Sequence, residues 1–179
     1  PHGFDPLEFK FLNLKRNGKV LSAVSLFEKR GKILGFDNWR WVSDELGCCT
    51  LVGHGNDKLK ESLGNFSLPR LVQWYNKSSV FLNTTVKSAM PRSRAEALMC
   101  GTPLITTNNY GINKYLVNNK SCIFADTKED MLKAAKKILD SKQMQVDLSC
   151  AGREAAIKHF GINDYLSRWE QVFQEVLGE

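Results

Sequence analysis

This sequence lacks several features that mark whole classes of protein. Its 179 residues contain no apolar run approaching the roughly 20 residues that a helix needs to cross a bilayer. No signal peptide, internal repeat or low-complexity tract is visible. These absences argue against a membrane-spanning helix and a repeat architecture, and we expect a cytoplasmic protein.

Metal-binding and disulfide patterns are also missing. The chain has only three His, and no C-x-x-C or Cys/His ligand spacing occurs. An odd number of cysteines, with one adjacent pair and apolar surroundings, is typical of reduced thiols. We therefore expect no metal site. The five cysteines are Cys48, Cys49, Cys100, Cys122 and Cys150.

The composition is that of an ordinary globular protein, with 42% hydrophobic and 25% charged residues. Its length fits one domain with a real core. The net charge of +6 suits an anionic ligand, a lipid headgroup surface or nucleic acid. A nucleic-acid surface would interleave aromatic residues with Lys and Arg. The sequence has no such run, so we expect no nucleic-acid partner.

Short apolar runs alternate with amphipathic segments along the chain. This alternation predicts an α/β fold, a Rossmann-like parallel sheet with helices on both faces. We expect a linker and lead-in at 1–18, an α/β nucleotide-binding core at 19–141 and C-terminal helices at 142–179. The expected strands are 19–25, 48–52, 63–66, 79–83, 103–107 and 121–124. The expected helices include 68–77, 111–117, one from Phe36 to Gly47, one after Thr127, and a last one near Asn163 that buries Leu166, Trp169, Phe173 and Val176.

The segments that follow the expected strands carry most of the glycine and clustered charge outside the helices. In a parallel sheet these segments meet at the carboxyl edge, where ligands bind. This arrangement predicts a nucleotide or phosphate site, but it does not specify a reaction. The segments are 26–32, 53–57, 67–68, 84–94 and 107–111.

Residues 87–107 combine a polar loop, a short helix and a buried strand. Pro91 is tolerated in a first helical turn, and Gly101 is typical of a helix end. Arg92 and Arg94 fall in the first turn, where free N–H groups and the helix dipole attract anions. The two guanidiniums are therefore candidate phosphate ligands, although a solvated helix start explains them equally well.

The run EALMCGTPLI at 96–105 resembles the E-A-M-x-x-G-x-P-V-[IV] segment of retaining glycosyltransferases of the GT-B fold, the glycogen-synthase-like group 1 family. Residues 3–5 are similar to the N-G-V-D linker of that family, and 51–55 to its I-V-G-x-G strand end. Residues 71–82 match its helix ending in tyrosine, followed by a strand. The chain therefore looks like the C-terminal, nucleotide-sugar-binding half of such an enzyme, without the N-terminal half.

The resemblance also implies site residues. It aligns Glu96 with the carboxylate that holds the ribose hydroxyls of the nucleotide. Without the resemblance, Glu96 would be interpreted as a solvated carboxylate near a helix N-terminus. The first motif carboxylate falls on Ser88. The family has an arginine and a lysine after its first strand. The arginine aligns with Ser25 and the lysine with Arg30, with Lys29 and Lys32 as alternatives for the lysine. We take Glu96, Arg30 and Lys32 as catalytic candidates. The substrate-binding candidates are Ser25, Gly53, Gly55, Ser88, Met90, Arg92, Ser93 and Arg94.

The resulting hypothesis is a donor-binding domain of a glycosyltransferase that uses a nucleoside diphosphate sugar and needs no further cofactor. The expected partners are that donor, the missing N-terminal domain, and an acceptor that is a glycan or a peripheral membrane component. We expect the isolated domain to be inactive. Ser25 and Ser88 support the alternative, a catalytically degenerate module that binds a nucleotide or a partner.

Overall fold

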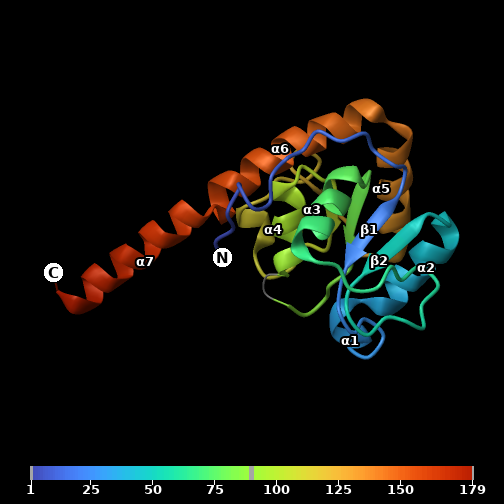
Figure 1. Cartoon of the computed structure of the whole chain (residues 1–179), viewed down its shortest axis with the longest axis horizontal. Helices are drawn as coiled ribbons and strands as arrows, with labels where there is room; N and C mark the ends of the chain where they lie inside the picture. The colour runs from blue at the N-terminus through green and yellow to red at the C-terminus, as the bar shows by residue number, and fades with distance from the viewer. Residues whose placement is uncertain (1, 89–90, 179) are drawn as a thin grey trace.

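The computed structural model describes residues 2–88 and 91–178. Its five strands form one parallel sheet in the order β2-β1-β3-β4-β5, with helices on both sides (Figure 1). The predicted fold class is therefore confirmed. In chain order the elements are β1 (Val20–Ala23), α1 (Gly31–Leu34), α2 (Phe36–Leu46), β2 (Cys49–Val52), α3 (Leu68–Lys77), β3 (Val80–Asn83), α4 (Arg92–Met99), β4 (Leu104–Thr106), the 3₁₀ turn η1 (Ile112–Lys114), β5 (Ile123–Phe124), α5 (Lys128–Asp140), α6 (Lys142–Phe160) and α7 (Ile162–Leu177).

The strands are mostly apolar because the sheet is covered on both faces. In β3 all four residues are buried. Alternate side chains enter two separate cores, since successive residues of a strand point to opposite faces. Phe81 packs with residues of α3, α4 and α6, whereas Val80 and Leu82 pack with residues of α2 and α5.

The order of the strands contains one reversal. From β1 the chain crosses to β2 on one side, and it then returns to place β3 on the other side of β1. The connections that leave the carboxyl ends of β1 and β3 therefore run in opposite directions. A crevice forms at such a point, and it is where open α/β sheets bind ligands.

The expected strand at 63–66 is wrong. The segment does lie beside β2, since the Leu63 N–H donates to Leu51 O at 2.8 Å and the Gly53 N–H donates to Gly64 O at 3.0 Å. Gly64 has a φ of +76°, however, and this left-handed residue interrupts the extended backbone. The segment is therefore an irregular edge to the sheet. The helix expected at 111–117 is reduced to the single turn η1.

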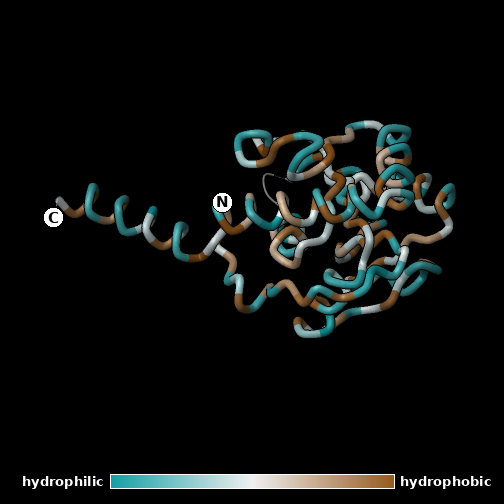
Figure 2. Tube along the Cα trace, turned by 90° about the horizontal axis from the view of Figure 1, so that it is seen from above, coloured by the Kyte–Doolittle hydropathy of each residue, from teal (hydrophilic) through white to brown (hydrophobic). Residues whose placement is uncertain are grey.

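The expected burial of the last helix is also wrong. The apolar side chains of α7 stay exposed, at 50% for Leu166, 46% for Trp169, 55% for Phe173 and 76% for Val176. Beyond its first turn α7 stands apart from the sheet and its covering helices (Figure 2). The predicted helix is present, but no other part of the described chain covers its apolar side chains. Among the described residues, no helix is long and apolar enough to cross a membrane.

The lead-in to β1 is fixed to the body at both ends. Phe4 and Phe9 are each only 3% exposed, and Phe4 forms a bridge with Gly161 at the joint between α6 and α7. Further along, Arg16 donates hydrogen bonds to the carbonyl oxygens of Asn76, Ser78 and Gly101. A cation suits this place because the carbonyls at the ends of α3 and α4 carry partial negative charge.

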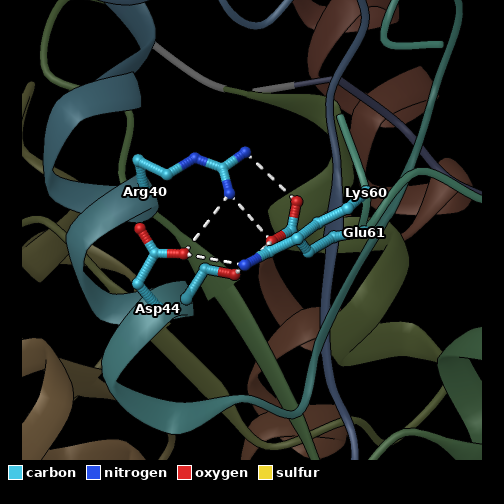
Figure 3. A network of polar contacts seen from close by, with 5 residues as sticks. Arg40, Asp44, Lys60 and Glu61 are labelled. Atoms are coloured by element: carbon cyan, nitrogen blue, oxygen red, sulfur yellow. Dashed lines mark hydrogen bonds and ion pairs between the residues drawn. The ribbon is translucent and has the colours of Figure 1, made fainter. Parts of the chain in front are cut away.

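An ion-pair network holds residues 60–61, just before the irregular edge segment, against α2 (Figure 3). Arg40 on α2 binds both carboxylate oxygens of Glu61, with N–O distances of 2.8 and 3.1 Å. The Glu61 side chain is 7% exposed, whereas Asp44, 3.6 Å from Arg40, is 50% exposed. Lys60 contacts both carboxylates. The bidentate pair with Glu61 is therefore the part of the network that stabilises the fold.

We predict that Glu61→Gln lowers the free energy of unfolding by about 1–3 kcal/mol, because it removes the buried, bidentate charged partner of Arg40 and leaves only the more exposed and more distant Asp44. Asp44→Asn is the matched control, and its effect should stay within about 0.5 kcal/mol since Asp44 itself is half exposed. Urea unfolding of both variants measures the difference. Equal effects would show that the pair contributes no more than a surface contact.

Candidate functional site

A cleft of about 450 Å³ opens at the carboxyl ends of β1 and β3, where the order of the strands reverses. Its walls come from the loop after β1, the irregular edge segment beside β2, one face of α3, the loop after β3 and the first turns of α4. The residues that line it are Ala23, Val24, Ser25, Arg30, Leu34, Val52, Gly53, Asn65, Phe66, Leu71, Tyr75, Asn83, Thr85, Ser88, Pro91, Arg92, Ser93 and Glu96.

Glu96 is the only carboxylate among these lining residues. It lies in the second turn of α4, and its side chain is 13% exposed. The Tyr75 hydroxyl donates to Oε2 at 3.0 Å, and the Arg92 Nε lies 3.7 Å from Oε1. Burial raises the pKa of Glu96, and the contacts with Tyr75 and Arg92 offset this only in part. Glu96 is thus a fixed, poorly solvated carboxylate with acceptor capacity left for a ligand.

The first turn of α4 gives the same cleft a positive end. Pro91 is the N-cap residue, and among the described residues no side-chain hydrogen bond caps the first N–H groups of the helix. Pro91, Arg92 and Ser93 all line the cleft, and the Arg92 side chain is 68% exposed. The Arg92 guanidinium also lies 5.7 Å from the ring centre of Phe4. Free N–H groups and an accessible guanidinium together form an anion-binding surface.

Arg94, two residues further on, points into the protein. Its side chain is fully buried and is not part of the cleft wall. It donates from Nε to Asn83 Oδ1 at 3.0 Å, from Nη1 to Asn109 Oδ1 at 2.9 Å and from Nη2 to Thr107 Oγ1 at 3.0 Å. Burial lowers the pKa of Arg94 to about 10. Arg94 therefore joins the ends of β3 and β4 to α4, and each of its three side-chain nitrogens donates one hydrogen bond within the protein.

The loop after β1 is shaped by contacts with the loop after β2. Asn56 donates to Val24 O at 2.7 Å and accepts from the Phe27 N–H at 2.9 Å. Gly53 has a φ of +142°, and a Cβ there would lie 2.1 Å from Val24 O, so only glycine fits. The Ser25 hydroxyl accepts from the His54 N–H at 3.2 Å. These contacts hold the Ser25 and Arg30 side of the cleft.

The structure thus gathers seven of the sequence-predicted residues around one cleft. They are Ser25, Arg30, Gly53, Ser88, Arg92, Ser93 and Glu96. Lys32, Gly55 and Arg94 lie outside its wall, and Met90 is outside the described residues. Gly55 instead packs against Leu26, since a Cβ there would lie 2.4 Å from Leu26 Cδ2.

Sequence reasoning missed several lining residues, of which Tyr75 is the most informative. Tyr75 is fully buried on α3 together with Val72 and Asn76. The spacing i, i+3, i+4 marks the inner face of the helix, and two polar residues on an inner face are a usable signal. Nothing in the sequence, however, connects Tyr75 with Glu96 on a different helix. The other missed polar or aromatic residues are Asn65, Phe66, Asn83 and Thr85.

Comparison with known proteins gives one family. Residues 19–173 match the family model described as glycosyl transferase-like. We found no significant match among curated protein sequences.

Solved structures share the fold at low identity. Sucrose-phosphate synthase from Thermosynechococcus elongatus has a TM-score of 0.81 at 16% identity, covering 99% of this chain and 52% of that chain. Anabaena HepE in complex with UDP has a TM-score of 0.81 at 13% identity, covering 97% and 56%. The C-terminal domain of LpcC, a glycosyl transferase group 1 family protein from Francisella tularensis, has a TM-score of 0.69 at 9% identity, covering 89% and 100%. The chain therefore spans about half of the first two and all of the third.

We predict that Glu96→Gln stabilises the fold relative to the native chain at neutral pH. Because the pKa of Glu96 is raised on folding, its favourable contribution is present under acidic conditions and is lost as pH rises through the folded-state pKa. The gain in melting temperature of the variant should therefore grow from mildly acidic to neutral pH. Glu154→Gln, at an exposed position of α6, is the matched control and should show no such trend. A pH-independent difference for Glu96→Gln would contradict the prediction.

Proposed function

Because the chain belongs to the glycosyl transferase-like family and has the architecture of a C-terminal GT-B half-domain, we propose that its cleft holds the nucleoside diphosphate sugar donor. One observation carries the proposal. A mostly buried carboxylate, a helix N-terminus with no side-chain cap among the described residues, and an accessible guanidinium meet at the point where the order of the strands reverses. A nucleoside diphosphate presents the complementary groups, which are a ribose diol and two linked phosphates.

Each side of the cleft has a proposed role. The Glu96 carboxylate accepts hydrogen bonds from the ribose hydroxyls, while Tyr75 keeps it in one orientation. Arg92 and the first turn of α4 bind the diphosphate, and Arg30 approaches it from the loop after β1. Gly53 supports the site by allowing the backbone after β2 to lie against Val24 in the loop after β1. The hydroxyls of Ser88 and Ser93 remain for the donor sugar or the phosphates.

The proposed reaction is transfer of the sugar from the diphosphate to an acceptor. The bond between the anomeric carbon and the phosphate oxygen breaks, and its electron pair stays on the departing diphosphate. The acceptor hydroxyl oxygen forms the new bond to the anomeric carbon, and its proton passes to the departing diphosphate. Arg30, Arg92 and the α4 N-terminus stabilise that growing negative charge, which is the main catalytic contribution of such groups. Lys32 is the less favoured cation because it lies outside the cleft wall. The acceptor site belongs to the other half of the enzyme, and the acceptor itself is proposed to be a glycan or a membrane component.

A binding module without turnover is the second candidate. Ser25 stands where the resemblance implies an arginine, and its hydroxyl accepts from the His54 N–H instead of offering a charge to the cleft. Ser88 likewise stands in place of a carboxylate. A domain with these two changes would still hold a nucleotide through Glu96 and Arg92. The two candidates agree on the ligand and differ only in the chemistry that follows.

We predict that the chain binds UDP in the cleft, because structures of HepE are described in complex with UDP and with UDP-glucose. Glu96→Gln should weaken UDP binding by about 1.5–3 kcal/mol, the usual value for a hydrogen bond to a charged group. Arg92→Gln should weaken binding of UDP but leave binding of uridine unchanged. Calorimetry with UDP, GDP, ADP and uridine measures these affinities.

Two distant substitutions serve as matched controls for this experiment. Glu154→Gln on α6 and Arg168→Gln on α7 repeat the same chemical changes away from the cleft and should leave UDP binding unchanged. If Glu96→Gln and Arg92→Gln bind UDP as tightly as the native chain, the cleft is not the nucleotide site.

We also predict that the isolated chain transfers no sugar at a useful rate, although it binds donor. Positioning of the acceptor supplies about 7–11 kcal/mol of barrier reduction in such reactions, and the acceptor half is absent from these residues. Supplying the N-terminal half should restore transfer from UDP-glucose, measured by UDP release with and without acceptor. If transfer remains undetectable after the N-terminal half is supplied while UDP binding is intact, the result would favour the binding module. Robust transfer by the isolated chain would contradict the two-domain account.

A further inference from the structure

A second cavity lies at the opposite edge of the sheet from the donor cleft. Its volume is about 580 Å³, within the range of small-molecule sites. Gly18 and Ser79 are on its wall, directly before β1 and β3, so it opens at the amino ends of the strands. The lead-in forms one side, and the end of α5 with the first turns of α6 forms the other. Figure 1 shows the lead-in running along α6 before it enters β1.

The wall of this cavity is largely carbon. Phe11 and Leu14 of the lead-in line one side of the cavity. Leu139 at the end of α5 and Val146 on α6 line the other side. Phe11 is 41% exposed and Val146 is 55% exposed. Covering such side chains is favourable by about 25 cal/mol for each Å² of apolar surface. The cavity therefore favours an apolar group over water.

Apart from Asn13 and the two lysines, the polar side chains of the wall are already used by the protein. Arg16 donates to three carbonyl oxygens and to Ser149 Oγ, and the Ser149 hydroxyl donates to Gly101 O. The Gln145 amide donates to Ile138 O at 2.9 Å. A ligand rich in hydrogen-bonding groups, such as a nucleotide or a sugar, would find few free partners here.

The charges of the wall have one sign. Lys15, Arg16 and Lys142 line the cavity, and none of its lining residues is acidic. Both lysines are exposed, and across residues 2–88 and 91–178 neither has a carboxylate within 4.0 Å. The wall thus offers an apolar surface and two ammonium groups that are free to bind an anion.

We propose that this second cavity binds one alkyl chain of an anionic amphiphile against Phe11, Leu14, Leu139 and Val146, with the charged head at Lys15 and Lys142. The ligand comes either from free fatty acid or from an anionic lipid at a membrane surface, since both present this chemistry. The site is separate from the donor cleft, and the proposal does not depend on the proposed transferase function.

Cys150 provides the measurement because its exposed thiol lies on the wall of the cavity. Three of the other thiols are buried, and burial raises the pKa of Cys49, Cys100 and Cys122 to about 12 in each case. In a Cys48→Ser background, a maleimide should therefore label Cys150 selectively. Dodecanoate below its micelle concentration should slow that labelling by the factor 1 + [L]/Kd, where [L] is the free dodecanoate concentration.

Matched ligands separate the head from the chain. Butyrate has the carboxylate without the long chain, and dodecyltrimethylammonium has the chain with a cationic head; neither should protect Cys150 as dodecanoate does. UDP should not protect it either. Vesicles of phosphatidylglycerol with phosphatidylcholine, compared with phosphatidylcholine alone, test the membrane source. Protection by the anionic vesicles but not by dodecanoate would assign the ligand to a membrane lipid.

Matched variants test the residues. Lys15→Gln with Lys142→Gln should abolish the protection, whereas Lys133→Gln with Lys136→Gln, at exposed positions of α5, should preserve it. Melting temperatures of both double variants confirm that the fold is intact. Three results would overturn the proposal: no protection by dodecanoate or by anionic vesicles, equal protection by dodecyltrimethylammonium, or full protection after loss of both lysines.

Discussion

The buried guanidinium of Arg94 is the constraint on which the site depends. A cation with no water around it is costly unless every donor is engaged. Here three side chains, Asn83, Thr107 and Asn109, accept from it. These acceptors come from the end of β3 and from the segment after β4, so the first turn of α4 has one position relative to the sheet. Arg92 and Glu96 are carried on the same short helix, and their places in the cleft follow from that anchor.

The donor cleft combines fixed and adaptable parts for a physical reason. Glu96 is held by Tyr75 and is poorly solvated, so its carboxylate is ready to bind and loses little freedom when it does. Arg92 is mostly exposed, so in the proposed complex it would lose side-chain entropy on binding the phosphates. On the other wall, Gly53 and Asn56 give the loop after β1 its shape through backbone contacts.

The sequence predicted the sheet and the carboxyl-edge site because both depend on local patterns. Apolar runs specify strands covered on two faces, and parallel order brings the loops that follow them together. Which of Arg92 and Arg94 faces the cleft and which is buried was not predictable in the same way. Residues two apart on a helix point about 200° away from each other, so one of the two had to face inward. Only the packing of α4 on the sheet decides which.

Other features depended on tertiary structure in a similar way. The hydrogen bond from Tyr75 to Glu96 joins two residues that are 21 positions apart in the chain and lie on different helices. The apolar stripe of α7 was visible as a pattern, but a pattern does not say what covers it. The segment 63–66 contains a glycine, which is unfavourable within a strand, and Gly64 takes a left-handed conformation there.

A crystal structure of this chain grown with UDP tests the central claim most directly. The account predicts electron density in the cleft between the loops after β1 and β3. The diphosphate should lie against Arg92 and the first N–H groups of α4, and the ribose hydroxyls within hydrogen-bonding distance of Glu96. Density for UDP in any other place, or an empty cleft at saturating UDP, would contradict it.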